Sequence, residues 1–270
     1  NLQNIPATPE HRSCFIVDKG NKFVNIDYSG QELRITTQGS KEPVWLDALN
    51  NGRDIHAEVA AMMFKVPIDK VREKPEFLRG KTYRDIAKNL NFGIIYGMSE
   101  FKLSKELVIT KEEAREMIDN YYKALPKLKS YLDSCKSYGM RNGYIRSFKP
   151  YSMIRFFPEW ANLNNLDEKS RKMAIGSIER QSGNTPIQSS GAHVTKLALI
   201  SIRRYIIDNK LENKVKLIST VHDEINCEVS EGFAEEWSKI QKDLMIKAGQ
   251  EIIKVIPVEV DCKITDFWKK

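Results

Sequence analysis

The chain has 270 residues, of which 41% are hydrophobic and 29% are charged, enough to bury a core as one large domain or two smaller ones. No apolar run approaches the length of a membrane span, so we expect no membrane partner. The four cysteines lack paired spacing, which excludes a typical zinc site and favours reduced thiols in an intracellular setting. The formal net charge of +7 favours a polyanionic partner.

The chain opens on an irregular segment, 1–12, without an initiator Met or a signal-peptide layout, so we expect it to be cut from a longer protein. A buried strand is predicted over 23–26. It ends at Asp27, and the chain turns into a helix near Gln31. This layout places Asp27 at the rim of a sheet, where a carboxylate reaches both solvent and ligand. Taken alone, Asp27 can also be explained without any ligand, as a turn residue or a helix N-cap.

The middle of the chain, from 41 to about 125, is predicted to be almost wholly helical. Thr110 and Glu113 form a capping box that marks one helix start. Helices are predicted over 44–49, 55–64, 77–96, from 110 onward, 126–140, 167–208 with a break near 183–186, and 231–253, and strands over 143–147 and 258–262. Strands near both ends with a helical block between them indicate an α+β fold, a sheet-based platform that carries a helical subdomain.

Two apolar, β-branched runs flank His222, Asp223 and Glu224, which predicts a β-hairpin whose tight turn carries two adjacent acids. Acids brought near a third carboxylate raise one another's pKa unless a cation lies between them. Mg²⁺ is such a cation, because it binds carboxylate oxygens together with substrate phosphates.

The predicted helix over 77–96 carries two cations and two aromatic residues on one broad face: Arg84, Lys88, Phe92 and Tyr96. Cations suit phosphates and an aromatic ring suits a base, so this face can grip a nucleotide at both ends. The alternative is a solvated basic turn that continues into a half-buried one. Gly93 and Gly97 count against it, because glycine inside a helix costs about 1 kcal/mol relative to Ala and marks close approach of another group.

Three segments resemble motifs A, B and C of the family A DNA polymerases, the group of bacterial DNA polymerase I and its phage and organellar relatives: DYSGQELR at 27–34, R-x3-K-x2-NFG-x2-YG at 84–97 and VHDE at 221–224. The segments NLQNIP at 1–6, GRDIH at 52–56 and PIQ at 186–188 resemble further family signatures. The resemblance implies an α+β right-hand fold: an antiparallel palm sheet with helices from 1–40 and 148–270, and inserted helical fingers from 41–147. The thumb and exonuclease domains would lie upstream, absent from this chain.

The resemblance implies template-directed DNA synthesis, the transfer of deoxynucleotides from dNTPs to a primer 3′-hydroxyl with release of pyrophosphate. Asp27, Asp223 and the carbonyl of Tyr28 would hold two Mg²⁺ ions, for which Mn²⁺ can substitute, about 3.5–4 Å apart. The ions would lower the pKa of the 3′-hydroxyl and neutralise the leaving pyrophosphate. Glu224 resembles the accessory carboxylate near the metals, and its alternative is a hairpin acid that faces water.

The incoming dNTP is assigned by the same resemblance. Arg84 and Lys88 resemble the triphosphate clamp, and Lys88 is also a candidate proton donor to the leaving group. His56 is a further phosphate contact, although a histidine on a helix face is equally a structural residue. Phe92 would pack on the sugar and the base of the nucleotide. Tyr96 and Glu32 would together close the space under the sugar C2′ and so exclude ribonucleotides. The full set of implied dNTP contacts is Tyr28, Glu32, His56, Arg84, Lys88, Phe92 and Tyr96.

The primer-template is assigned to the palm. Arg180, Asn184 and Gln188 resemble residues that touch the minor groove, where the acceptors are nearly the same for every base pair, and His222 resembles a primer-end contact. The alternative for Asn184 and Gln188 is capping across the helix break at Pro186. The partners implied are primer-template DNA, dNTPs and an upstream thumb, with or without an exonuclease domain. The setting would be the cytoplasm or nucleoid, or a DNA-containing organelle.

Some positions depart from the bacterial pattern. Gly30-Gln31 and SSGAH at 189–193 look closer to phage and organellar members, and Asp85 replaces a common second Arg. Two rival functions remain. A single-subunit RNA polymerase shares several of these elements, but Glu32 and the NFG segment at 91–93 argue against it. An inactive DNA-binding fragment is the other, because a chain without its thumb loses much of its grip on the duplex.

Overall fold

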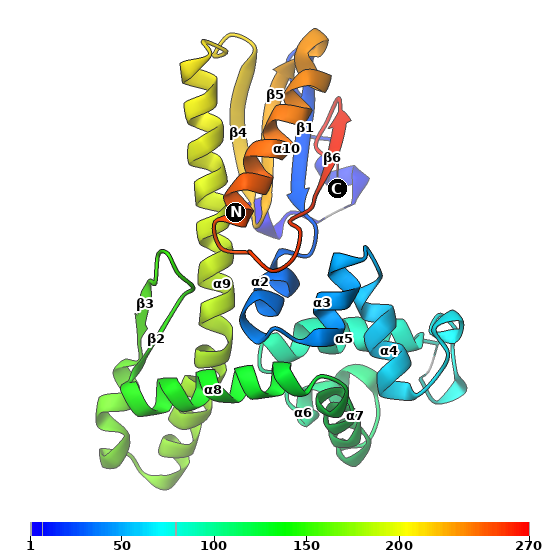
Figure 1. The fold of residues 1–270 in the computed structure, drawn as a ribbon, viewed down its shortest axis with the longest axis vertical. Coiled ribbons are helices and arrows are strands. Elements are labelled where there is room, and N and C mark those ends of the chain that lie inside the picture. The colour runs from blue at the N-terminus through cyan, green and yellow to red at the C-terminus, as the bar shows by residue number, and fades with distance from the viewer. Residues whose placement is uncertain (1, 7, 79, 270) are drawn as a thin grey trace. The chain divides into compact units, whose positions relative to one another are not determined.

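The structure is a computed structural model that describes residues 2–6, 8–78 and 80–269. Asn1 of the NLQNIP signature, and Arg79 within the predicted helix over 77–96, lie outside the described residues. The chain divides into two compact units (Figure 1). The first comprises 1–31 and 190–270, and the second comprises 32–189. The predicted palm and fingers boundaries, 40/41 and 147/148, differ from these limits and stay a prediction about function.

The first unit is built on a four-stranded antiparallel sheet with the strand order β4-β5-β1-β6. Its strands are β1 (Asn21–Tyr28), β4 (Val215–Val221), β5 (Glu224–Ser230) and β6 (Val260–Thr265). The central strand β1 is buried along most of its length, as its apolar run predicts. The register aligns Asp27 with Glu224 on one side and with Asp261 on the other.

Consecutive residues of the central strand β1 are buried, so both of its faces are covered. Helix α10 (Ala234–Gln250) lies across one face, where the Tyr28 hydroxyl donates to the Met245 carbonyl at 2.7 Å (Figure 1). A separate cluster of Phe23, Val221 and Trp268 also packs in this unit, with segments from both ends of the chain. The short elements η1 (Leu2–Asn4), α1 (Pro9–Arg12) and η5 (Glu231–Phe233) complete the unit.

The second unit is mostly helical, and the stretch from 41 to about 125 is almost wholly so, as predicted. Its elements are α2 (Gln31–Ser40, whose first residue belongs to the first unit), α3 (Pro43–Asn50), α4 (Ile55–Phe64), η2 (Ile68–Lys70), η3 (Glu76–Leu78), α5 (Tyr83–Ile95), α6 (Glu100–Leu107), α7 (Lys111–Ala124), α8 (Pro126–Asn142), a hairpin of β2 (Tyr144–Arg146) and β3 (Ile154–Phe156), η4 (Pro158–Asn165), and the part of α9 (Glu168–Asp208) up to residue 189, the rest of which belongs to the first unit. The capping box at Thr110 and Glu113 is confirmed at the start of α7. Strand β3 and helix η4 were not predicted.

Two helix predictions are wrong in their limits. Helix α5 begins at Tyr83 and not at residue 77, because Thr82 and Asp85 form a capping box there and Gly80 adopts a left-handed φ of +83°. The predicted helix over 231–253 is shorter in the structure, where α10 runs only from Ala234 to Gln250. The last strand, predicted over 258–262, is β6 and spans Val260–Thr265.

The predicted break near 183–186 is also wrong. Helix α9 (Glu168–Asp208) runs through Pro186 without interruption. Proline removes one backbone donor, but buried side chains on both sides of it, Ile178, Ile187 and Val194, keep the helix in place. Within the described part of the chain, no helix is long and apolar enough to cross a membrane.

Candidate active site

Two acids predicted from distant parts of the sequence meet at one end of the sheet in the first unit. Asp27 is the last residue but one of β1, and Asp223 lies in the two-residue turn between β4 and β5, where His222 adopts a left-handed φ of +58°. Because Asp27 is directly opposite Glu224, its Cα lies about 5 Å from that residue, next to Asp223. Burial, and then the Asp223 charge, raise the pKa of the Tyr28 hydroxyl.

The oxygen donors at this end fit a hard divalent cation. Both carboxylates are half-buried, and the Tyr28 carbonyl belongs to the same strand end. Within the described residues, no group of three or more His, Cys, Asp and Glu side chains is arranged to hold a metal. Mg²⁺ does not require such a cage, because it binds one or two carboxylates, water and substrate phosphates. The residues present therefore suit magnesium better than zinc.

Glu224 is buried, with 2% of its surface exposed, so the alternative of a hairpin acid facing water is wrong. Its Oε1 accepts from Trp268 Nε1 at 2.6 Å and from Asn226 Nδ2 at 2.8 Å. The Arg12 guanidinium lies 3.9 Å from its Oε2 and stacks 3.9 Å from the Trp268 ring. These contacts tie the hairpin that carries Asp223 to segments from both ends of the chain. Nothing in them tests the accessory metal role, which stays a prediction.

In the second unit, helix α5 has the two faces that the sequence predicts. Ile86, Leu90 and Ile94 are buried, whereas Lys88 and Tyr96 are exposed and Arg84 and Phe92 are half-buried. Tyr96 is the C-cap residue of this helix. The four predicted nucleotide contacts therefore lie on the accessible side of one helix and its C-cap.

The two glycines of α5 and its C-terminus are closely approached, as expected. A Cβ on Gly93 would clash with the end of the Met98 side chain. A Cβ on Gly97 would lie 2.8 Å from Arg180 Cγ, and Gly97 has a φ of +75°. Gly97, which follows α5, therefore packs against the aliphatic part of the Arg180 side chain on α9, a predicted DNA contact.

Replacing Gly97 by Ala is expected to lower the free energy of unfolding by about 2–3 kcal/mol, because it adds backbone strain to a clash with Arg180. Gly52→Ala is the matched control: Gly52 has a φ of +62° but open space around it, so only the strain of about 1–2 kcal/mol applies. Urea denaturation of both variants measures the difference. Equal losses would show that Arg180 moves aside without cost.

Glu32 and Tyr96 form a direct pair in the second unit. The Tyr96 hydroxyl donates to Glu32, with distances of 2.5 Å to Oε1 and 2.6 Å to Oε2. The pair links the first turn of α2 to the end of α5, and both groups are accessible to solvent. Two residues that the sequence assigns to one role are thus brought together, although they come from different motifs.

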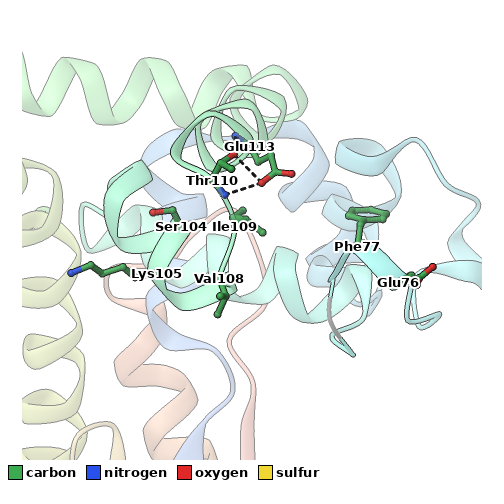
Figure 2. A pocket seen from close by; sticks show the side chains of 8 residues that line it. All are labelled: Glu76, Phe77, Ser104, Lys105, Val108, Ile109, Thr110 and Glu113. Atoms are coloured by element: carbon green, nitrogen blue, oxygen red, sulfur yellow. Dashed lines mark hydrogen bonds between the residues drawn. The ribbon is translucent and has the colours of Figure 1, made fainter.

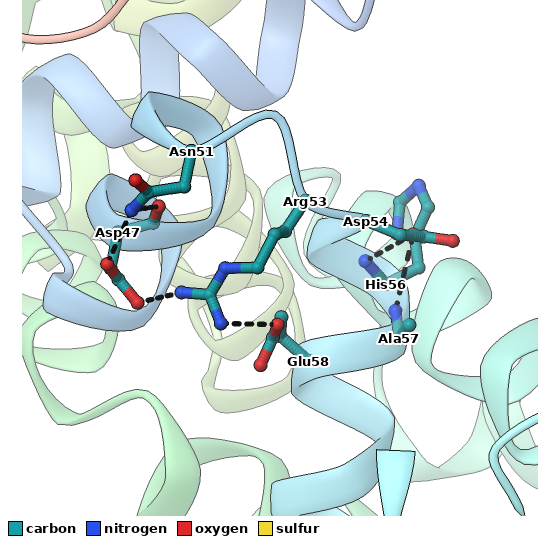
Figure 3. Close-up of polar contacts among 7 residues, drawn as sticks. All are labelled: Asp47, Asn51, Arg53, Asp54, His56, Ala57 and Glu58. Atoms are coloured by element: carbon teal, nitrogen blue, oxygen red, sulfur yellow. Dashed lines mark hydrogen bonds and ion pairs between the residues drawn. The ribbon is translucent and has the colours of Figure 1, made fainter. Parts of the chain in front are cut away.

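Arg84 is held in place by an acid that the sequence analysis missed. Asp54 is the N-cap of α4, where its Oδ1 accepts from the backbone N–H groups of His56 at 3.0 Å and Ala57 at 3.3 Å (Figure 3). Its Oδ2 accepts from Arg84 Nε at 2.5 Å. Burial raises the pKa of Asp54, but Arg84 and the two N–H groups outweigh burial and hold that pKa below its ordinary value. The N-cap position in GRDIH was the signal that could have revealed it.

The predicted DNA contacts of the second unit share one face of α9. Arg180, Asn184 and Gln188 are four residues apart, and Arg180 and Gln188 are exposed. Because α9 is continuous here, Asn184 and Gln188 do not cap a break, and that alternative is wrong. His222 lies in the other unit, exposed in the β4–β5 turn.

A pocket of about 810 Å³ in the second unit lies elsewhere (Figure 2). Phe77, Lys105, Val108 and Thr110 are among the residues that line it, and no predicted site residue does so. It is wide open to solvent. The pocket therefore does not belong to the candidate active site.

Comparison with known proteins places these motifs in a family. The model of DNA polymerase family A matches residues 1–270. The chain is 34% identical to DNA polymerase I of Borreliella burgdorferi, over 99% of the chain and 28% of that protein. It is 32% identical to the thermostable DNA polymerase I of Thermus aquaticus, over 99% of the chain and 30% of that protein. The chain thus spans less than a third of the length of these curated relatives.

A solved structure agrees in fold. The POL domain of Pol1 from M. smegmatis, in complex with DNA primer-template and dNTP, has a TM-score of 0.84 and 31% identity over 99% of this chain and 44% of that one. These relatives are bacterial, so the expected closeness to phage and organellar members stays a prediction. A family match over the whole chain, together with the α+β architecture, shows that the chain belongs to DNA polymerase family A.

Proposed function

We propose that this chain is the palm and fingers portion of a DNA-directed DNA polymerase, a nucleotidyltransferase that adds deoxynucleotides to a primer 3′-hydroxyl and releases pyrophosphate. The observation that carries the proposal is the strand register that brings Asp27 beside the Asp223 turn. Two carboxylates fixed at the end of one sheet are the donor set that nucleotidyl transfer requires. Family membership supports the same reaction.

Asp27, Asp223 and the Tyr28 carbonyl would hold two Mg²⁺ ions, or Mn²⁺ in their place. When bound, such ions activate the attacking 3′-hydroxyl and neutralise charge on the leaving pyrophosphate. The protein contributes rigidity: the strand ladder fixes Asp27, and the tight turn fixes Asp223. The buried Glu224 network holds that hairpin in shape and would place its carboxylate near the metals as the accessory acid.

The accessible face of α5 would bind the dNTP. Arg84 and Lys88 would clamp the triphosphate, and Lys88, whose side chain is exposed, would donate a proton to the leaving group. The hydrogen bond to Asp54, the N-cap of α4, holds the Arg84 side chain and so limits the conformational freedom that binding must remove. His56 would add a further phosphate contact.

The other end of the substrate would meet aromatic groups. Phe92 would pack on the sugar and base, and the Tyr96–Glu32 pair would close the space under the sugar C2′. Arg180, Asn184 and Gln188 on α9, and His222 in the hairpin turn, would contact the primer-template. The partners are then primer-template DNA, dNTPs and the remaining polymerase domains of a longer polypeptide, in a DNA-containing compartment of the cell.

Phe92 is expected to make the enzyme use dideoxynucleotides poorly, because a phenyl ring offers the 3′ position no hydrogen bond. Phe92→Tyr adds a hydroxyl at that place and is expected to raise the ratio of dideoxy to deoxy incorporation about tenfold or more. Competition between the two nucleotide types in primer extension measures the ratio. Equal use of both by the unmodified enzyme would contradict the assignment of Phe92.

The test of the function is template-directed primer extension by the full-length protein, with dNTPs and ribonucleotides offered in competition. Magnesium-dependent extension with dNTPs supports the proposal. Preference for ribonucleotides would instead identify a single-subunit RNA polymerase. Salt-dependent DNA binding without any extension would identify an inactive DNA-binding protein.

A further inference from the structure

His56 receives a hydrogen bond on its Nδ1. Asn91 Nδ2 lies 2.8 Å from that nitrogen. A side-chain amide nitrogen only donates hydrogen bonds, so Nδ1 must accept and carries no proton in this arrangement. The proton of a neutral ring then lies on Nε2, because the bond made by one ring nitrogen sets the state of the other.

The orientation of the Asn91 amide is itself set from the core. The Tyr121 hydroxyl on α7 donates to Asn91 Oδ1 at 3.0 Å. Both Asn91 and Tyr121 are completely buried. If the amide turned over, its nitrogen would donate to the Tyr121 oxygen, and the buried Tyr121 hydroxyl hydrogen would lose the Asn91 oxygen as its acceptor, which is costly. A chain of hydrogen bonds thus runs from Tyr121 through Asn91 to the ring of His56, across α7, α5 and α4.

The surroundings keep this ring neutral and in place. Burial lowers the pKa of His56 to about 4; Asp54 opposes this, whereas Arg84 and Lys88 reinforce it. The Phe92 ring lies 5.8 Å away, tilted by 46°. The backbone N–H of His56 is fixed by Asp54 at the helix N-terminus. Near neutral pH, His56 is therefore an uncharged donor with a fixed orientation, beside the basic side chains of Arg84 and Lys88.

We propose that Asn91 and Tyr121 are positioning residues that hold His56 in its Nε2–H tautomer, so that it presents a neutral hydrogen-bond donor to a phosphate of the incoming nucleotide. This inference rests on the proposed function for the identity of the ligand. A neutral donor adds a directional contact where a third cation would repel Arg84 and Lys88. Neither positioning residue touches the substrate, and both act through His56.

Tyr121→Phe removes the hydroxyl that orients Asn91. The amide is then free to turn its oxygen toward His56, which moves the proton to Nδ1 and leaves a lone pair on Nε2 facing the phosphate. We expect the KM for dNTP to rise about tenfold, as loss of one hydrogen bond to a charged group gives, with kcat changed less than about threefold. Tyr122→Phe is the matched control. The Tyr122 ring lies 5.8 Å from the Tyr121 ring but does not belong to the chain of hydrogen bonds that reaches His56.

A second background separates positioning from general support of the fold. In a protein that already carries His56→Ala, Tyr121→Phe is expected to cause no further rise in KM, because its effect passes through the imidazole. If Tyr121→Phe raises KM equally in both backgrounds, or lowers kcat with KM unchanged, the residue supports only the fold and the proposal is overturned.

The tautomer is measured without any mutation or substrate, by nitrogen-15 NMR of the full-length protein labelled at histidine. We expect the His56 signals of a protonated Nε2 and a bare Nδ1 near neutral pH, and the reverse in Tyr121→Phe. A protonated Nδ1 in the unmodified protein would overturn the proposal even if the enzyme is active. Failure of the proposed function would appear differently, as a complete lack of primer extension, and would overturn only the part that concerns the nucleotide.

Discussion

Primer extension by the full-length protein is expected to fall at least about a thousandfold when Asp223, or separately Asp27, is replaced by Asn. The amide has the size of the carboxylate but lacks its charge, so it binds a hard divalent cation poorly. A thousandfold loss corresponds to about 4 kcal/mol of transition-state stabilisation, the scale that metal-ion catalysis supplies. Single-turnover incorporation at saturating dNTP and magnesium measures the loss.

Asp261→Asn is the matched control for this prediction. Asp261 lies directly opposite Asp27 on β6, and its Oδ2 accepts from the Ser29 hydroxyl at 2.7 Å. It belongs to the same row of the sheet but is not one of the proposed ligands, so we expect activity within about threefold of the original. If the three variants lose activity equally, the acidic row acts as a whole, and the assignment to Asp27 and Asp223 fails. Retained DNA binding and unchanged thermal unfolding exclude a folding defect.

Replacing Glu32 by Ala is expected to raise ribonucleotide incorporation relative to deoxynucleotide incorporation by about tenfold to a hundredfold. The carboxylate accepts from the Tyr96 hydroxyl, and the pair is proposed to block the place of a 2′-hydroxyl. Removing a steric barrier of this size changes discrimination by about 1–3 kcal/mol. The measurement is the ratio of kcat/KM for the two sugars with the same base.

Two further variants sharpen this prediction. Glu32→Gln keeps the volume of the side chain, so retained selectivity would show that bulk, and not charge, closes the space. Glu58→Ala removes another carboxylate of the second unit. The Glu58 carboxylate pairs with Arg53 at a distance of 2.8 Å and not with Tyr96 (Figure 3). We expect Glu58→Ala to leave sugar selectivity unchanged. Selectivity that is also unchanged in Glu32→Ala would refute the role of the Glu32–Tyr96 pair.

Local patterns predicted the elements that carry the candidate site. The strand before Asp27, the hairpin around Asp223 and the two faces of α5 follow from short-range periodicity and turn chemistry, and the structure confirms each of them. The capping box at Thr110 was equally visible, because its two partners are three residues apart. The start of α5 was missed although Thr82 and Asp85 form the same motif.

The break predicted at Pro186 shows where local rules fail. Proline weakens one turn of a helix, but whether the helix continues depends on what its other residues bury. In α9 apolar side chains before and after Pro186 are buried against the rest of the chain, and the helix continues. No window of sequence contains that information.

By itself, the sequence determined the class of fold, the family and the residue types that are proposed to hold metal, phosphate and sugar, because these depend on spacing along one strand, turn or helix. Only the tertiary structure decided which partners those residues have. Glu224 is buried against Trp268, Arg84 is held by Asp54, and His56 is held by Asn91. Such pairs join segments that are distant in the chain, and packing within each unit fixes them when it removes polar groups from water.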